Sequence, residues 1–315
     1  MRKKKRASST IDMSFGARLA RDIQRHRGTY LLMIPVVLYY LIFCYKPMYG
    51  ALIAFQDYEP TKGIMGSTWV GLEHFRRFFA SPDCYRVIKN TLVISISSII
   101  WGFPAPILLA IMINELRNKR FKSIAQTVSY LPHFISMVVV CGLIKTFVSS
   151  GGVILQLSQM LGGKNVGMLS RSELFVPIYI ISNIWQGCGW DSIIYLAAIS
   201  GISADLYEAA EIDGSGRIGR IIHVTIPGML PTIITMLILK LGSIMSVGYE
   251  KIILLYNPLI YETSDVLGTF TYRIGIGGQE WSYSAALGIF NSVVNMIIVI
   301  IANNISKKLT ETSLW

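Results

Sequence analysis

The sequence predicts an all-α membrane protein that crosses the bilayer six times. Hydrophobic residues make up 52% of its 315 residues, and charged residues make up only 15%. Soluble domains carry about 25% charged residues, so the low charge indicates contact with lipid rather than an unusually large core. Long apolar runs alternate with polar stretches, and a spanning helix needs roughly 20 mostly apolar residues.

Six runs meet that length and define the expected domain organisation. The expected transmembrane helices cover residues 30–55, 90–113, 128–148, 174–199, 232–255 and 283–305. Pro104 and Pro106 interrupt the second of them. The transmembrane domain is expected at 29–305, with a core from about 90 to 305 and a polar loop at 201–227. A basic segment at 1–28 precedes this domain, and a short tail at 306–315 follows it.

Basic residues set the expected orientation. Lys and Arg crowd the N-terminal segment and recur in the loops at 117–122 and 217–220 and in the tail. Cytoplasmic loops are enriched in these residues, so both termini and the 201–227 loop are expected in the cytoplasm, although the first outer loop is also basic. A basic tail can also bind nucleic acid. Because this basic segment lies directly before a span, a role in anchoring that end of the span in the cytoplasm is favoured, and no nucleic-acid partner is expected. The first apolar run is too long for a signal peptide and lacks a clear cleavage site.

Two short amphipathic helices are expected at the membrane surfaces. Ile11, Phe15, Leu19 and Ile23 fall every four residues among arginines, a pattern typical of a helix that lies along the lipid headgroups or of a solvated tail. In the first outer loop, phenylalanines at helical spacing within residues 69–79 predict a second such helix, which rests on the membrane or meets a partner.

The polar loop between the fourth and fifth expected spans contains a helix with a defined end. The spacing predicts a helix over Ala204–Ile212, and small residues such as Ala209 let another protein approach closely. Gly214 ends the helix, as glycine commonly does. Pro227 and Pro231 are expected to bracket the start of the fifth span. A water-facing helix held between two spans would transmit a push to both.

A three-part pattern runs through this loop: Glu208-Ala209-Ala210, then Gly214, then Val224-x-Ile226-Pro227. The pattern resembles the EAA loop of binding-protein-dependent ABC transporter permeases, with Ile226 where that family usually has leucine. In that family the loop forms a coupling helix that docks in a cleft on the ATPase subunit. The resemblance implies ATPase-coupling roles for Glu208, Ala209, Ala210, Asp213, Gly214, Val224, Ile226 and Pro227.

Four further motifs resemble the carbohydrate-importer branch of the family, and more narrowly its LplB-like polysaccharide or oligosaccharide permeases. They lie at residues 47–50, 69–72, 130–136 and 256–259. The resemblance implies a MetI-like transmembrane fold in the cell membrane and a carbohydrate substrate. It also implies three kinds of partner: a second permease subunit, usually a paralogue, two ATPase subunits, and an extracellular solute-binding lipoprotein.

No cofactor, nucleotide or metal site is expected on this chain. Residues 214–219 fit G-x-G-x-x-G, but a dinucleotide fingerprint follows a strand, and the preceding residues are expected to be helical. The phosphate-binding pattern G-x-x-x-x-G-K-[ST] does not occur. ATP and Mg are therefore expected on the partner ATPase, and this chain is not expected to be an enzyme. The four cysteines and four histidines show no metal-ligand spacing.

The fourth expected span carries the densest polar and aromatic group. Polar residues within a span usually face a cavity or a protein partner, and sugars are bound by aromatic faces and hydrogen-bonding side chains. These residues are therefore candidates for lining a substrate path, while helix packing with interfacial aromatics is an equally open interpretation. The candidates are Asn183, Trp185, Gln186, Trp190, Asp191 and Tyr195.

Other polar residues within the expected spans have structural interpretations. Asp191 and Lys240 lie at matched depths, so they either form an ion pair or separately reach a wet cavity and the membrane surface. Asn291 and Asn295 share one helix face and are expected to make interhelical hydrogen bonds. Lys251, near the outer end of the fifth span, is expected at the interface or against a partner.

The function predicted on this basis is that of a permease subunit in an ATP-driven ABC importer. Its expected substrate is a carbohydrate, in the form of an oligosaccharide or polysaccharide fragment that an extracellular binding protein delivers. Two alternatives stay open: a secondary carrier driven by an ion gradient, and an ABC permease for a solute other than a sugar. Secondary carriers often have paired broken helices, and the break at Pro104 has no evident counterpart.

Overall fold

The computed structural model describes residues 15–160, 162, 167–310 and 313–314, and most of these are helical. The α-helices are α1 (Phe15–Arg25), α2 (Arg27–Tyr39), α3 (Lys46–Met48), α4 (Gly63–Gly66), α5 (Glu73–Ala80), α6 (Pro82–Ser97), α7 (Pro104–Asn114), α8 (Lys119–Tyr130), α9 (Met137–Val148), α10 (Val153–Met160), α11 (Ser172–Ser200), α12 (Ala204–Ile212), α13 (Arg217–Arg220), α14 (Ile226–Leu241), α15 (Tyr249–Leu255), α16 (Tyr261–Ser264), α17 (Leu267–Tyr272) and α18 (Trp281–Thr310).

Short 3-10 and π-helical segments join many of these helices into longer stretches. The 3-10 segments are Tyr49–Phe55, Leu131–Phe134, Met168–Ser170 and Pro258–Ile260, and the π-helical segments are Tyr40–Tyr45, Ser98–Gly102, Ile221–Thr225 and Arg273–Gly277. Within the described residues the strands are β1 (Gln56–Asp57) and β2 (Thr68–Trp69), which pair antiparallel with Gln56 opposite Trp69. The all-α prediction is confirmed.

Five continuous helical stretches in the described part of the chain are long and apolar enough to cross a membrane. They are Arg27–Phe55, Pro82–Asn114, Met137–Met160, Arg217–Leu241 and Trp281–Lys308. A sixth span is the 29-residue α11. It meets the length and hydropathy requirements for a span when taken together with α12, and the two helices are bent relative to each other by 71°. The prediction of a polytopic protein with up to six spans is confirmed.

Two expected spans were placed wrongly along the chain. The third begins at Met137 rather than at 128, because Pro132 lies in a 3-10 turn and Ser136 caps a new helix by accepting a hydrogen bond from the Val139 amide. The fifth covers Arg217–Leu241 rather than 232–255.

The error at the fifth span has a local cause. The helix passes through Pro227 and Pro231 without a break, because the π-helical turn Ile221–Thr225 precedes the first proline and the second is accommodated inside α14. The span ends at Leu241, before Gly242 and Gly248 separate it from α15.

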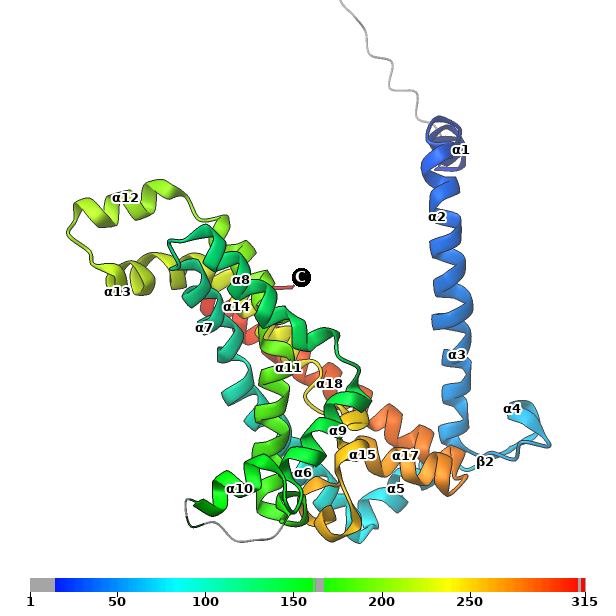
Figure 1. The fold of residues 1–315 in the computed structure, drawn as a ribbon. Coiled ribbons are helices and arrows are strands. Elements are labelled where there is room, and N and C mark those ends of the chain that lie inside the picture. The colour runs from blue at the N-terminus through cyan, green and yellow to red at the C-terminus, as the bar shows by residue number, and fades with distance from the viewer. Residues whose placement is uncertain (1–14, 161, 163–166, 311–312, 315) are drawn as a thin grey trace, which may run out of the picture.

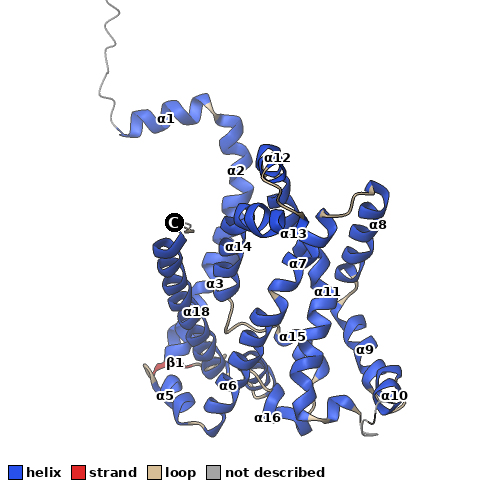
Figure 2. Cartoon of the chain, turned by 90° about the vertical axis from the view of Figure 1, so that its left-hand side faces the viewer, coloured by secondary structure: helices blue, strands red, loops and turns tan. Residues whose placement is uncertain are grey.

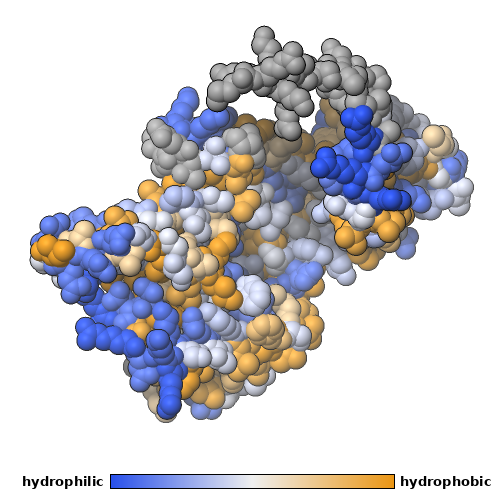
Figure 3. Space-filling model, turned by 90° about the horizontal axis from the view of Figure 1, so that it is seen from above, coloured by the Kyte–Doolittle hydropathy of each residue, from blue (hydrophilic) through white to orange (hydrophobic). Residues whose placement is uncertain are grey.

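The elements sort to two ends of the molecule (Figures 1 and 2). Helices α1, α12 and α13 lie at one end, and α5, α10 and α16 lie at the other. Seen from the first end in Figure 3, hydrophilic surface gathers where α12 and α13 project and again at α1. This arrangement agrees with the expected topology, in which the basic N-terminal segment and the α12 loop share the cytoplasmic side.

The first span stands apart from the other helices (Figure 1), and its described residues are largely exposed. It joins the remainder of the protein at its outer end, where Tyr49–Phe55 packs against α18. Exposed apolar side chains along it include Leu31, Leu32, Phe43 and Tyr45. Apart from this outer end, the helix is exposed to lipid or to another protein.

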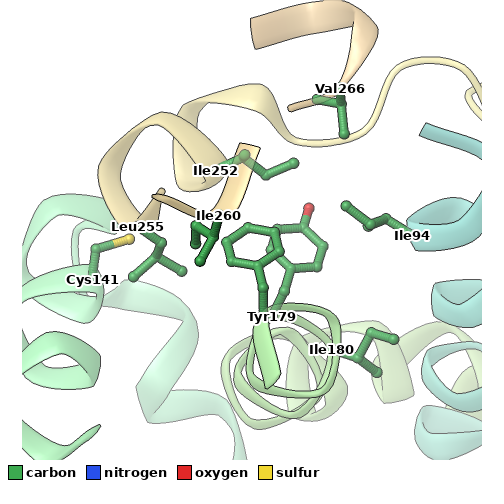
Figure 4. Close-up of a cluster of buried hydrophobic side chains, with 9 residues drawn as sticks. Ile94, Cys141, Tyr179, Ile180, Ile252, Leu255, Ile260 and Val266 are labelled. Carbon is green, nitrogen blue, oxygen red and sulfur yellow. The ribbon is translucent and has the colours of Figure 1, made fainter. Parts of the chain in front are cut away.

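The remaining spans pack around three apolar clusters. Figure 4 shows the first, in which Ile94 of α6, Cys141 of α9, Tyr179 of α11 and Ile252 of α15 converge. A second cluster joins α5, α6, α17 and α18 around Phe78. A third joins α7, α11 and α14. Helix α11 thus lies at the centre of the bundle.

Where α8 crosses α11, Gly189 lets the two backbones meet. A Cβ atom at Gly189 would lie 1.9 Å from the carbonyl oxygen of Ser129 and 2.4 Å from its carbonyl carbon, so no other residue fits without moving a helix. A small residue at a helix crossing is typical of membrane bundles.

A buried charge network holds the outer end together. The carboxylate of Asp265, 0% exposed, accepts hydrogen bonds from both terminal nitrogens of Arg273 at 3.0 and 2.8 Å and from Arg86 at 3.0 Å. These bonds raise the pKa of Arg273 further above its usual range. Asn90 donates to the backbone carbonyls of Glu262 and Asp265 at 2.9 and 3.0 Å. The network ties the loop between the fifth and sixth spans to α6.

Candidate coupling loop and translocation cavity

Helix α12 is capped at both ends. Ser203 begins it by accepting a hydrogen bond from the amide of Asp205. At the other end Gly214 adopts φ +76°, a conformation that favours glycine. The amides of Gly214 and Ser215 then donate to the carbonyls of Glu211 and Ala210, which is the Schellman arrangement. The helix expected at Ala204–Ile212 is confirmed, and its ends are fixed by sequence-local bonds.

Side chains tie α12 back to the spans. The Tyr207 hydroxyl lies 3.0 Å from Oγ1 of Thr225, which is buried, and Arg220 donates to Glu211 at 3.0 Å. Arg217, at the start of the fifth span, donates to the carboxylate of Glu115 and, at 2.7 Å, to its backbone carbonyl. Glu115 directly follows α7, so the fifth span, to which α12 is bonded, is in turn bonded to the end of the second span.

The predicted coupling residues lie on or beside this projecting helix. Six are exposed, namely Glu208, Ala209, Asp213, Gly214, Ile226 and Pro227, whereas Ala210 and Val224 are half-buried. Ile212 is also 86% exposed at the tip of α12, an apolar side chain in a water-facing loop. Thr225 and Arg217 were not predicted as site residues, because their partners Tyr207 and Glu115 lie far from them in the sequence.

A cavity of about 790 Å³ lies between the spans. Its wall is formed by α6 and the turn after it, α7, α11, α14, the turn before α9 and the segment after Leu241. Polar side chains on the wall come from several elements: Ser95, Ser98, His133, Asn183, Gln186, Asp191, Lys240, Ser243 and Ser246. Ligand pockets commonly measure 300–1,000 Å³, so the cavity has the size of a binding site.

The structure divides the six substrate-path candidates. Asn183, Gln186, Asp191 and Tyr195 line the cavity. Trp185 and Trp190 do not line it, and each is more than 40% exposed. Trp190 instead stacks on His133, with ring centroids 4.5 Å apart and planes at 3°. Since His133 lines the cavity, Trp190 supports the wall from behind.

The polar residues discussed for the fourth, fifth and sixth spans have different outcomes. Asp191 and Lys240 face the same cavity, yet no ion pair within 4.0 Å joins them in the described structure. Asn291 and Asn295 share one face of α18 and donate to Ser246 at 3.2 and 3.0 Å, so their bonds run to the segment between α14 and α15 rather than to another helix.

The position expected for Lys251 was wrong. The residue is 1% exposed and donates to Oδ1 of Asn183 at 2.7 Å. Short helix α15 folds back against α9 and α17, which encloses a residue that a straight fifth span would have left at its outer end.

Comparison with known proteins decides the family. Residues 102–311 match the family described as binding-protein-dependent transport system inner membrane component. The chain belongs to this family. It is 41% identical over 299 residues to the polygalacturonan/rhamnogalacturonan transport system permease protein YteP of Bacillus subtilis, covering 95% of this chain and 93% of that protein. It is 39% identical over 313 residues to Protein LplB of the same organism, covering 99% and 98%.

Solved structures agree with this assignment. The chain superposes with a TM-score of 0.86 and 46% identity on a chain of a bacterial ABC transporter involved in the import of the acidic polysaccharide alginate, covering 93% of this chain and 99% of that chain. A second structure, of a bacterial alginate ABC transporter in complex with an alginate pentasaccharide-bound periplasmic protein, gives a TM-score of 0.86 at 45% identity, covering 94% and 100%.

Family membership fixes the general role of the chain. It is a multi-pass inner-membrane permease subunit of an ABC importer, and permease subunits of this family are not themselves enzymes. The resemblance to LplB-like permeases is confirmed.

Proposed function

We propose that the chain forms half of the membrane pore of an ATP-driven importer for an oligosaccharide or polysaccharide fragment. The observation that carries the proposal is full-length similarity to carbohydrate permeases: Protein LplB aligns with 99% of the chain, and the alginate importer chain has a TM-score of 0.86. The size of the cavity and its mixture of polar and apolar wall residues support a sugar substrate.

A second permease subunit completes the pore. One feature supports this partner: most of the first span is exposed, with no buried residue in its apolar window. A paralogue is the proposed partner, and lipid covers what the paralogue leaves exposed. An extracellular binding protein delivers the sugar, as in the complex of the alginate importer with its periplasmic protein.

ATP hydrolysis takes place on two separate ATPase subunits, which also hold the ATP and Mg. Helix α12 is the element that meets one of them, through Glu208, Ala209 and the exposed residues that follow. A push on α12 reaches α11 through the bend at residues 201–203 and the fifth span through Tyr207 and Thr225. From the fifth span it reaches the end of α7 through Arg217 and Glu115. The spans then move together and open the cavity to one side or the other.

Reconstitution of the complete transporter tests this function. The chain, its paralogue and the ATPase are co-expressed, purified through a tag on this chain, and placed in proteoliposomes with the binding protein and labelled oligosaccharide. The ATPase is expected to co-purify, and uptake is expected to stop when ATP is withdrawn while the proton gradient is maintained. Uptake that continued on the gradient alone would favour a secondary carrier. ATP-driven uptake of other solutes, with no sugar transported, would favour a different ABC permease.

A further inference from the structure

Lys251 is a buried cation directly behind the cavity wall. Its side chain is 1% exposed, and its Nζ donates to Oδ1 of Asn183, which lines the cavity, at 2.7 Å. The ring of Tyr179, also on the wall, lies 5.8 Å from Nζ. Figure 4 shows the Tyr179 hydroxyl pointing away from α11 toward α15, the helix that carries Lys251.

This positive charge has no carboxylate partner among the described residues. The hydrogen bond to Asn183 and the Tyr179 ring are the contacts of its ammonium group. The acidic residue on the cavity wall is Asp191, which faces Lys240 across the same space. A buried charge without a counter-charge is strongly unfavourable. Lys251 carries this cost directly behind the cavity wall, so an anion bound on the wall at Asn183 would offset it.

The hydrogen bond also orients Asn183. An ammonium group only donates, so the amide oxygen of Asn183 must face Lys251. The NH2 group of Asn183 is therefore turned away from Lys251 and is available to donate toward Tyr179 or into the cavity. Both the charge and the donor at this end of the cavity suit a negatively charged ligand.

We propose that Lys251 and Asn183 form a selectivity site for the carboxylate of an acidic sugar. Asn183 donates to the carboxylate, and Lys251 provides the charge and holds the amide in the donating orientation. Lys251 is accordingly a positioning residue, and Asn183 is the group that touches the substrate. This proposal rests on the proposed function, because it assumes that the cavity is the sugar path.

The test compares two ligands that differ only at their carboxyl groups. Reconstituted transporter and binding protein are supplied with a uronate oligosaccharide or with the same oligosaccharide after its carboxyl groups are reduced to alcohols. The selectivity ratio is the uptake efficiency for the acidic form divided by that for the reduced form. Because every variant uses the same binding protein, its own preference cancels when ratios are compared between variants.

Lys251→Gln is expected to lower the selectivity ratio about tenfold, the change expected from losing one charge-assisted contact. Lys251→Arg should retain most of the ratio. Asn183→Asp gives Lys251 an internal counter-charge at nearly constant side-chain volume. It should lower the selectivity ratio as much as Lys251→Gln does. This second variant keeps the test valid if Lys251→Gln does not fold. Lys145→Gln, on the exposed face of the neighbouring helix α9, is the matched control and should leave the ratio unchanged.

The outcomes separate the two proposals. An equal ratio in wild type, Lys251→Gln and Asn183→Asp would overturn the selectivity site while leaving ATP-driven sugar import intact. ATP-independent uptake, or no uptake of either sugar by the wild-type complex, would instead overturn the proposed function.

Discussion

Replacing Ala209 with arginine is expected to abolish transport while leaving the permease folded in the membrane. Ala209 is exposed on α12, and its small side chain allows a partner to approach the helix closely. A long charged side chain would hold the ATPase away. Disrupting the centre of a close-packed interface costs about 2 kcal/mol or more, so ATP-driven uptake should fall roughly 30-fold or further. Uptake by proteoliposomes measures the loss of transport, and co-purification of the ATPase measures the loss of ATPase binding.

Ala209→Ser is the matched control, because serine remains small at the same exposed position. It should retain uptake and ATPase binding close to wild type. If Ala209→Arg transported sugar at the wild-type rate with the ATPase still bound, α12 would not be the contact that the ATPase uses, and the proposed path from α12 to the spans would have to be abandoned.

Replacing Asp265 with asparagine is expected to produce the largest loss of stability. The carboxylate is fully buried and accepts from Arg86 and Arg273, so its removal leaves Arg273 without its counter-charge and Arg86 with only the more exposed Asp83. Breaking a buried pair on one side costs about 3–5 kcal/mol. We expect the lower end of this range, because the two arginine side chains are 35% and 33% exposed. Thermal unfolding of the purified protein in detergent measures the change.

Asp83 provides a matched control for this substitution. It pairs with the same Arg86 at 2.7 Å, but its side chain is 38% exposed. Exposed ion pairs contribute less than about 1 kcal/mol, so Asp83→Asn should change the melting temperature only slightly. Equal melting temperatures for the two variants would show that burial of Asp265 does not hold the outer loop in place.

The features that sequence predicted well are those set by local residues. The bounds of α12 follow from Ser203 and Gly214, which satisfy the ends of the helix through neighbouring backbone groups. The number of spans follows from the lengths of the apolar runs in the sequence. The third and fifth spans were misplaced because hydropathy alone does not show where a helix turns at Pro132 or continues through Pro227 and Pro231.

The cavity could be predicted only in part. Asn183, Gln186, Asp191 and Tyr195 share a face of one helix, so the polar stretch on α11 located that wall. The other wall residues come from distant segments, and nothing near Lys251 in sequence indicates that it packs behind Asn183. The place of Trp190 could not be predicted, because it depends on His133, a residue of another segment that stacks on it and lines the cavity.

Cysteine labelling tests the central claim, that α12 faces the cytoplasm where an ATPase reaches it. Cys44, Cys84, Cys141 and Cys188 are first replaced with serine or alanine. Ala209→Cys and Met65→Cys, the latter at a position 90% exposed at the opposite end, are then treated in intact cells with a membrane-impermeant maleimide. We predict that Met65→Cys reacts at once and that Ala209→Cys reacts only after permeabilisation, with protection by the ATPase. Labelling of Ala209→Cys in sealed cells would place α12 outside and contradict the account.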